Sequence, residues 1–189
     1  MPYSDSRPIP YYSQMANSQF PFGSCNLTSL AMVLEYLGVT PRTSARFPDE
    51  LIDYCESSGL DRHEADSLVK IASDYLAADN FRSNATIQQV KDWLNSPLKR
   101  AVILHGYFTA SGHIIVLTGY DETGFWVNDP YGEWRVDGYD RNDDVDSTKG
   151  KQLHYSFGMV DRSCNDTERT GMWAHFLGEW PAKLPVPTK

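Results

Sequence analysis

The period of the hydrophobic residues changes near residue 100, and this change limits the folds open to the chain. Before it, apolar residues recur three or four positions apart and predict helices over residues 25–37, 48–58, 64–77 and 86–96. After it, runs rich in β-branched and aromatic residues predict strands over residues 101–105, 112–120, 125–128 and 171–177. Helices followed by strands are typical of an α+β fold. We therefore expect a helical lobe packed on a curled antiparallel sheet.

The first predicted helix begins at a cysteine, Cys25. Gly23 and Ser24 form a turn of small residues before it, and Gly38 closes the helix. Unpaired N–H groups give the start of a helix a partial positive charge, which stabilises a thiolate, the reactive form of cysteine. Cys25 is therefore a candidate nucleophile, although a buried structural cysteine fits the same pattern.

A predicted hairpin brings a histidine close to an aspartate. His113 begins the strand over residues 112–120, the next four residues form a turn, and the returning strand ends at Asp129. Because the start of one hairpin strand lies beside the end of the other, we expect His113 and Asp129 to be neighbours. A carboxylate bonded to one imidazole nitrogen leaves the other nitrogen to accept the proton of Cys25. Singly, the two residues fit a core histidine and a turn aspartate, but together with Cys25 they favour a catalytic triad.

The order cysteine, histidine, aspartate resembles the papain-like cysteine peptidases, and more closely the bacteriocin-processing, double-glycine peptidases and their stand-alone relatives. Four motifs cover most of residues 9–132: Ile-Pro-Tyr-Tyr-Ser-Gln from residue 9, Gly-Ser-Cys-Asn-Leu-Thr-Ser-Leu-Ala-Met from residue 23, Gly-His-Ile-Ile-Val-Leu-Thr-Gly-Tyr from residue 112 and Asn-Asp-Pro-Tyr-Gly from residue 128. The resemblance implies a papain-like fold with the active site between its lobes. It also implies that Cys25 is the nucleophile, His113 the base and Asp129 the orienting acid.

The family also has a glutamine before the nucleophile, whose side-chain amide helps to bind the oxyanion of the reaction. Two glutamines compete for this role. Gln14 ends the Tyr-Tyr-Ser-Gln motif of the stand-alone relatives, whereas Gln19 lies six positions before Cys25, the spacing of papain itself. We favour Gln14, because insertions readily change a spacing. The backbone N–H of Cys25 is expected to be the second donor.

Length and charge agree with one enzyme domain over residues 1–189. The core motifs lie in residues 9–132, residues 133–180 form a family-variable part of the sheet, and residues 181–189 form a tail. A formal net charge of −8 argues against nucleic acid as a partner and weakly favours basic or neutral substrates. No apolar run is long enough to span a membrane and no signal peptide is recognised, so we expect a cytoplasmic or virion-associated protein without a membrane partner.

The sequence indicates no cofactor and no metal. Residues 140–146 alternate oxygen ligands as calcium loops do, but Val145 stands where such a loop needs glycine and Lys151 where it needs glutamate. A solvated acidic loop is the favoured interpretation. His154 and His175 lack the spacing of paired zinc ligands.

Three other residues of reactive types receive no catalytic role. Cys55 lies in a predicted helix and is interpreted as a packing residue, and Cys164 lies in a polar stretch without an assigned function. With three cysteines in the chain, a disulfide framework is not expected. His105, in the strand over residues 101–105, could line the cleft, although an ordinary strand position is favoured.

These observations predict a thiol-dependent hydrolase that cleaves peptide or other amide bonds through the triad and an acyl-enzyme. Peptides or proteins are the expected substrates. The 189 residues hold no transporter domain, so double-glycine specificity is not carried over. Three alternatives stay open: an acyltransferase with the same triad, an endopeptidase for peptidoglycan peptides, and a catalytically weak binding or structural module of a larger assembly such as a phage particle.

Overall fold

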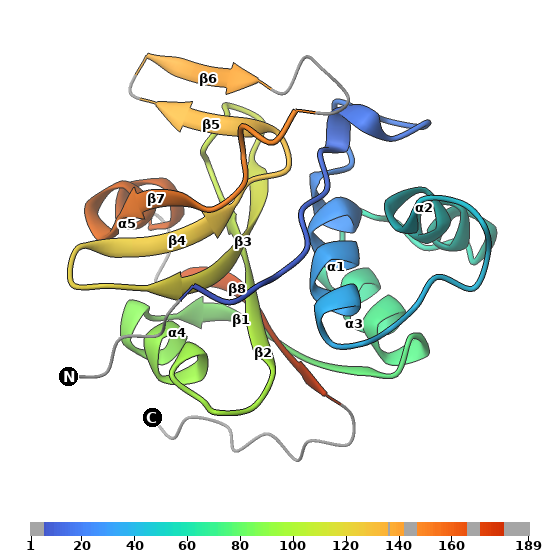
Figure 1. The fold of residues 1–189 in the computed structure, drawn as a ribbon, viewed down its shortest axis with the longest axis horizontal. Helices are drawn as coiled ribbons and strands as arrows, with labels where there is room; N and C mark the ends of the chain where they lie inside the picture. Colours follow the sequence, from blue (N-terminus) through green and yellow to red (C-terminus); the bar gives the residue numbers. More distant parts are fainter. Residues whose placement is uncertain (1–5, 136, 142–146, 166–170, 180–189) are drawn as a thin grey trace.

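A six-stranded antiparallel sheet forms the centre of the fold, with helices on both of its faces (Figure 1). The computed structural model describes residues 6–135, 137–141, 147–165 and 171–179. The strands of this sheet, in chain order, are β1 (Ala77–Ala85), β2 (Arg100–Gly106), β3 (His113–Tyr120), β4 (Gly124–Asn128), β7 (Leu153–Ser156) and β8 (Met172–Glu179). Their spatial order is β1, β8, β2, β3, β4, β7, and all neighbours are antiparallel. The expected α+β class is confirmed.

The helices are a 3-10 turn η1 (Gln14–Ala16) and the α-helices α1 (Cys25–Tyr36), α2 (Phe47–Ser57), α3 (Ala65–Asp74), α4 (Ile87–Leu94) and α5 (Phe157–Cys164). The hydrophobic period predicts α1 to α4, with one difference in length. The prediction of a helix over residues 64–77 is wrong at its end. Leu76 has a positive φ of 61°, which an α-helix does not contain, and Ala77 already begins β1.

The sequence pattern does not predict β1, β7, α5 or the small second sheet of β5 (Gly132–Arg135) and β6 (Gly138–Arg141). β1 has the sequence Ala-Ala-Asp-Asn-Phe-Arg-Ser-Asn-Ala, which has few residues that favour strands. It is a strand because it pairs along β8, from Ala77 opposite Glu179 to Ala85 opposite Met172. Tertiary pairing thus overrides local preference here.

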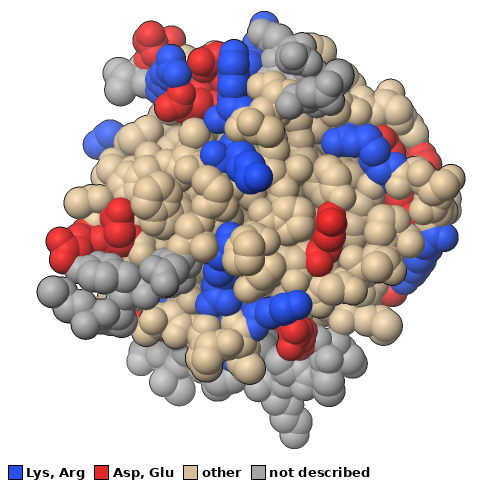
Figure 2. All heavy atoms as spheres, viewed as in Figure 1, with Lys and Arg blue, Asp and Glu red and all other residues tan. Residues whose placement is uncertain are grey.

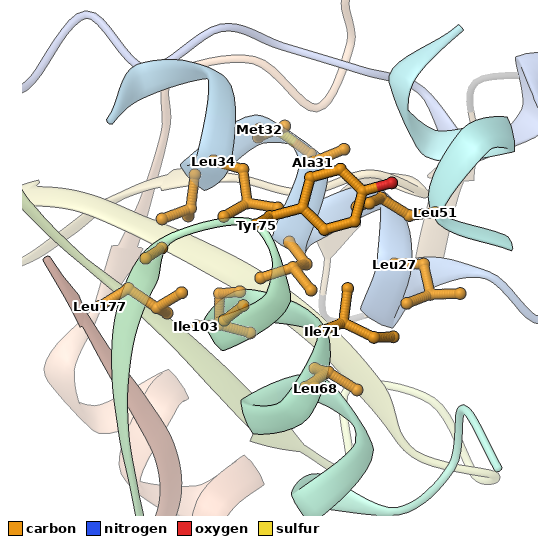
Figure 3. Close-up of a cluster of buried hydrophobic side chains, with 14 of the residues drawn as sticks. Leu27, Ala31, Met32, Leu34, Leu51, Leu68, Ile71, Tyr75, Ile103 and Leu177 are labelled. Atoms are coloured by element: carbon orange, nitrogen blue, oxygen red, sulfur yellow. The ribbon is translucent and has the colours of Figure 1, made fainter. Parts of the chain in front are cut away.

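Two hydrophobic cores lie on the two faces of the sheet. Alternate residues of β2 face opposite sides, so that Ala101 and Ile103 join one core and Val102 and Leu104 join the other. The first core packs α1, α2 and α3 against the sheet, and Figure 3 shows part of it: Leu27, Ala31, Met32, Leu34, Leu51, Leu68, Ile71, Tyr75, Ile103 and Leu177. Cys55 belongs to this core, as its interpretation as a packing residue requires.

The second core packs α4 and α5 on the opposite face, and Cys164 at the end of α5 is buried in it. Because both faces of the sheet are covered, the strands at its centre are almost fully buried. Helices α1, α2 and α3 therefore form one lobe, and the sheet with α4 and α5 forms the other (Figure 1).

Charged side chains form small groups of both signs on the face shown in Figure 2, and most of that face is uncharged. Among the described helices, none has the length and apolar character needed to cross a membrane. Residues 142–146 of the candidate calcium loop and the predicted tail over residues 181–189 lie outside the described residues.

Candidate active site

Cys25 is the first residue of α1, and the surrounding structure holds this helix start in place. Residues 26–34 of α1 are all buried between α2, α3 and β3, so the helix has little freedom to move. Asn17 fixes the turn before it: its Nδ2 donates to Ser24 Oγ and to Thr28 Oγ1, each at 2.8 Å. The thiol itself is partly exposed, at the wall of a surface cleft. The thiol at this helix start is therefore accessible from the cleft.

His113 lies between Cys25 and Asp129. Its Nε2 is 2.7 Å from Asp129 Oδ1, and both side chains are almost completely buried. His113 begins β3 and Asp129 follows β4, so the antiparallel pairing of these strands brings the two residues together, as the hairpin predicts. The Cys25 thiol lies on the same cleft as the imidazole and is close enough to contribute to the raised pKa of His113. Because Nε2 is occupied by Asp129, Nδ1 is the nitrogen left for the sulfur.

The charge state of His113 is set by opposing effects. Burial alone disfavours the imidazolium, but the negative charge of Asp129, the hydrogen bond to Asp129 and the nearby Cys25 thiol outweigh burial and raise the pKa of His113 to about 10. The site therefore favours a protonated imidazole next to the sulfur at neutral pH. A protonated imidazole stabilises a thiolate.

Asp129 accepts four hydrogen bonds, which use both of its oxygens. Oδ1 accepts from His113 and from the backbone N–H of Tyr131 at 2.9 Å. Oδ2 accepts from the hydroxyls of Tyr139 and Tyr155, each at 2.9 Å. Burial and the adjacent charge of Asp129 raise the pKa of both phenols, so they remain donors throughout the physiological range. The carboxylate is thus held in one orientation.

Sequence reasoning does not find Tyr139 and Tyr155. They come from β6 and β7, strands of four residues each that lack a readable alternation. Tyr139 reaches the site from the small sheet, where its ring also packs edge-on against His113 at 5.6 Å between centroids. The sequence shows only that both tyrosines follow residue 132, where the last of the four motifs ends.

The structure brings Gln14 to the cleft but not Gln19. Gln14 is buried, its Nε2 donates to the carbonyl of Pro21 at 2.8 Å, and it lines the same cleft as Cys25 and His113. Its backbone N–H donates to the carbonyl of Pro130, which ties η1 to the loop after Asp129. Gln19 instead donates to Asp53 at 2.7 Å on the exposed surface of the helical lobe. Of the two glutamines, Gln14 is therefore the one that lines the cleft.

The cleft has a volume of about 570 Å³ and lies between the helical lobe and one end of the central strands. Its wall contains Gln14, Cys25 and His113, together with exposed aromatic side chains. Phe22 is 70% exposed, Tyr107 46% and Trp173 37%. Exposed aromatic side chains gathered at a cleft are typical of a binding surface.

Other titratable residues lie elsewhere or behind the cleft. His154 pairs with Asp121 at 3.1 Å on the surface, and His175 pairs with Asp79 at 2.7 Å in the interior. In the described part of the chain, no three His, Cys, Asp or Glu side chains are grouped in a way that could hold a metal ion. His105, which the sequence favours as an ordinary strand residue, does line the cleft.

Comparison with known proteins identifies the fold and the family. The family model described as "Peptidase_C39 like family" matches residues 7–157. The structure is similar to a double glycine motif protease from an AMS/PCAT transporter, crystallised in complex with the leader peptide (20% identity, TM-score 0.53, covering 94% of this chain and 99% of that chain). It is also similar to a C39-like peptidase from Bacillus anthracis (17% identity, TM-score 0.58, 91% and 95%). No curated protein sequence matches significantly.

Proposed function

Because the chain belongs to the Peptidase C39 like family of cysteine peptidases, we propose that it cleaves peptide bonds with Cys25 as nucleophile, His113 as base and Asp129 as orienting acid. The observation that carries the proposal is the grouping of the three side chains: Cys25 and His113 line one cleft, and His113 Nε2 lies 2.7 Å from the buried carboxylate of Asp129. This is the arrangement in which a base activates a nucleophile and a third group orients the base.

The proposed reaction has two steps. The Cys25 thiolate attacks the substrate carbonyl carbon, a C–S bond forms, and the C–N bond breaks while Nδ1 of the His113 imidazolium gives its proton to the departing amine. Water then attacks the thioester carbon, His113 accepts a proton from that water, a C–O bond forms, and the C–S bond breaks so that the carboxylic acid product leaves and the Cys25 thiolate is released. The proton returns to the pair of Cys25 and His113, so the enzyme is regenerated.

The oxyanion formed in each step needs hydrogen-bond donors. The backbone N–H of Cys25 stands at the start of α1, where such groups have no partner within the helix. Gln14 is proposed as the second donor, because one N–H of its amide is held by Pro21 and the other belongs to a side chain that lines the cleft. Loss of one such donor typically lowers kcat by about 100-fold or more.

Tyr139 and Tyr155 are proposed as positioning residues. They do not touch the substrate, but together with the Tyr131 N–H they occupy every free acceptor direction of Asp129. A carboxylate held in this way can accept from His113 Nε2 in only one geometry. The imidazole is therefore kept with Nδ1 toward the sulfur through the whole reaction.

A peptide is the substrate class that the cleft supports. One structurally similar protein was crystallised with a leader peptide, and the cleft here is open at the surface and flanked by the exposed rings of Phe22, Tyr107 and Trp173. An extended peptide can bury such rings with its side chains while its scissile carbonyl reaches Cys25. Peptides of the cell wall belong to the same chemical class.

The decisive experiment compares wild type, Cys25→Ala and Cys55→Ala on a quenched fluorescent peptide library. Cys55 is the matched control, because its thiol is buried in the first core and lies outside the cleft. We expect hydrolysis by wild type and by Cys55→Ala, and none by Cys25→Ala. Full hydrolysis by Cys25→Ala contradicts the mechanism. If the wild-type protein cleaves no peptide and Cys25 is unreactive, the chain is instead a binding module. If an added amine gives amide products, the reaction is acyl transfer.

A further inference from the structure

A buried asparagine joins the two segments that carry the proposed oxyanion donors. Asn17 follows η1, and its backbone N–H donates to the carbonyl of Gln14 at 3.1 Å. Its side-chain Nδ2 donates to Ser24 Oγ and to Thr28 Oγ1, each at 2.8 Å, at the start of α1. All three of these polar side chains are buried. One residue is thus bonded both to the turn that carries Gln14 and to the helix start that carries Cys25.

The neighbours of Asn17 determine which way its amide points. Thr28 Oγ1 gives its only hydrogen to the backbone carbonyl of Ser24, at 2.7 Å, so it accepts from Asn17. On the other side, Arg46 at the start of α2 donates to Asn17 Oδ1 at 2.7 Å, and a guanidinium has no acceptor. The Nδ2 group therefore faces α1 and the Oδ1 atom faces Arg46. Both ends of the amide have partners, so its orientation is fixed.

The side-chain bonds of Asn17 close a loop at the cleft. This loop is formed by residues 17–24, with Asn17 at its beginning and Ser24 at its end. It contains Pro21, whose carbonyl accepts the hydrogen bond of Gln14 Nε2 at 2.8 Å. The other polar atom of that side chain, Gln14 Oε1, is buried without a hydrogen-bond partner among the described residues. The Gln14 amide is therefore anchored by one bond, and that bond leads to the loop that Asn17 closes.

Other contacts of the loop lead away from the proposed donors. The backbone N–H and the hydroxyl of Ser18 donate to Asp49 of α2, and Arg62 donates to the carbonyl of Gly23 at 3.3 Å. These bonds hold the loop against α2 and the segment that follows it. Within the described part of the chain, the hydrogen bonds between residues 14–17 and residues 24–28 are all made by the Asn17 side chain.

We propose that Asn17 is a positioning residue for the oxyanion hole, and that it sets the Gln14 amide at a fixed distance from the Cys25 N–H. The inference deepens the peptidase function proposed above and rests on it. Asn17 does not line the cleft, so it acts through the two donors and not on the substrate. Donors stabilise an oxyanion only where their placement is fixed before the reaction, and a misplacement of about 1 Å can cost about 100-fold in rate.

The first test separates oxyanion binding from the reactivity of the thiol. Iodoacetamide alkylates Cys25 at a saturated carbon and forms no oxyanion, whereas a peptide aldehyde adds the thiol to its carbonyl and places the resulting oxygen in the oxyanion hole. The aldehyde is built on the best-cleaved peptide. We expect Asn17→Ala to lower kcat and the affinity for the aldehyde about tenfold. KM and the alkylation rate should stay at their wild-type values. Ser24→Ala removes one of the two Nδ2 bonds and should give a smaller loss in the same direction.

The second test asks whether Asn17 acts through Gln14. Gln14→Ala alone should lower kcat by about 100-fold. Once that donor is absent, its distance from the Cys25 N–H has no effect, so Asn17→Ala in the same chain should lower kcat by no more than about twofold further. If the two losses multiply in the double variant, Asn17 acts on another part of the site and the proposal is overturned.

Tyr75→Phe is the matched control for stability. It removes another buried hydrogen bond of the helical lobe, from Tyr75 to Glu50 at 2.8 Å, and neither residue lines the cleft. The control should lower Tm by a few degrees, as Asn17→Ala does, and leave kcat and the aldehyde affinity unchanged. Wild-type kcat and aldehyde affinity in Asn17→Ala overturn the proposal, as do equal losses in Asn17→Ala and Tyr75→Phe. Wild-type kcat in Gln14→Ala contradicts instead the oxyanion role in the proposed function, and the role of Asn17 falls with it.

Discussion

Replacement of Tyr139 or Tyr155 by phenylalanine tests how the site is held together. Each change removes one hydroxyl from Asp129 Oδ2 and keeps the ring. The two hydroxyls differ in one respect: that of Tyr155 also accepts the backbone N–H of Trp134 at 2.8 Å. Both variants should therefore loosen the orientation of the Asp129 carboxylate to the same extent. Only Tyr155→Phe also removes the acceptor of the Trp134 N–H.

The magnitudes follow from these contacts. A hydrogen bond to a charged group contributes about 1.5 to 3 kcal/mol to stability, and the buried Asp129 offers water little access to replace it. Loss of the acceptor for the partly buried Trp134 N–H adds about 1 kcal/mol. Tyr155→Phe should thus be less stable than Tyr139→Phe by about 1 kcal/mol, or roughly 2 to 4 °C in Tm for a chain of this size. Looser orientation of His113 should lower kcat/KM about tenfold in both, equivalent to about 1.4 kcal/mol.

The assay combines urea unfolding with the pH profile of kcat/KM. When one donor is removed, Asp129 interacts more strongly with the imidazolium, so the already raised pKa of His113 rises further and the alkaline limb of the profile moves to higher pH. If the tyrosines had a purely structural role, the substitutions would lower the stability of the fold and leave the alkaline limb at its wild-type pH. Wild-type kcat/KM and an unmoved limb in Tyr139→Phe would refute the positioning argument, and equal stability of the two variants would refute the role assigned to Tyr155.

Two further predictions concern the reacting groups. Gln14→Ala should lower kcat by about 100-fold with little change in KM. Gln19→Ala removes only a surface hydrogen bond to Asp53 and should leave both constants unchanged. The reverse ranking would transfer the oxyanion role to Gln19. Alkylation of wild type by iodoacetamide should stay fast well below pH 8.5, where free thiols ionise, and should slow in His113→Ala. Identical profiles in the two proteins would show that no ion pair of Cys25 and His113 exists.

The residues of the proposed triad could be predicted because each is tied to a strong local pattern. Cys25 precedes a long apolar repeat, which fixes a helix start, and His113 precedes a run of β-branched residues, which fixes a strand start. Asp129 could be placed beside His113 because the turn between β3 and β4 is short and determines which strand ends meet. Local pattern and hairpin geometry were enough for these three residues.

The residues that surround the triad depend on pairing between distant segments. Tyr139 and Tyr155 lie on strands of four residues, too short for a period of two to be recognised. Asp79 lies on β1, which is a strand because of its pairing with β8, about 95 residues further along the chain. No local propensity predicts that pairing, so neither the support of Asp129 nor the pair of Asp79 and His175 could be derived from the sequence.

Net charge also describes a different surface from the one that a substrate meets. The value of −8 led to an expectation of basic or neutral substrates, because it averages over every side chain. A substrate group in the cleft is close to His63, His105 and His113 and to no described carboxylate of the lining. Charges on the outer surface are screened by salt over about 8 to 10 Å, whereas those facing a partly enclosed cleft are screened less. Local composition of the cleft should therefore decide which substrate charge is preferred.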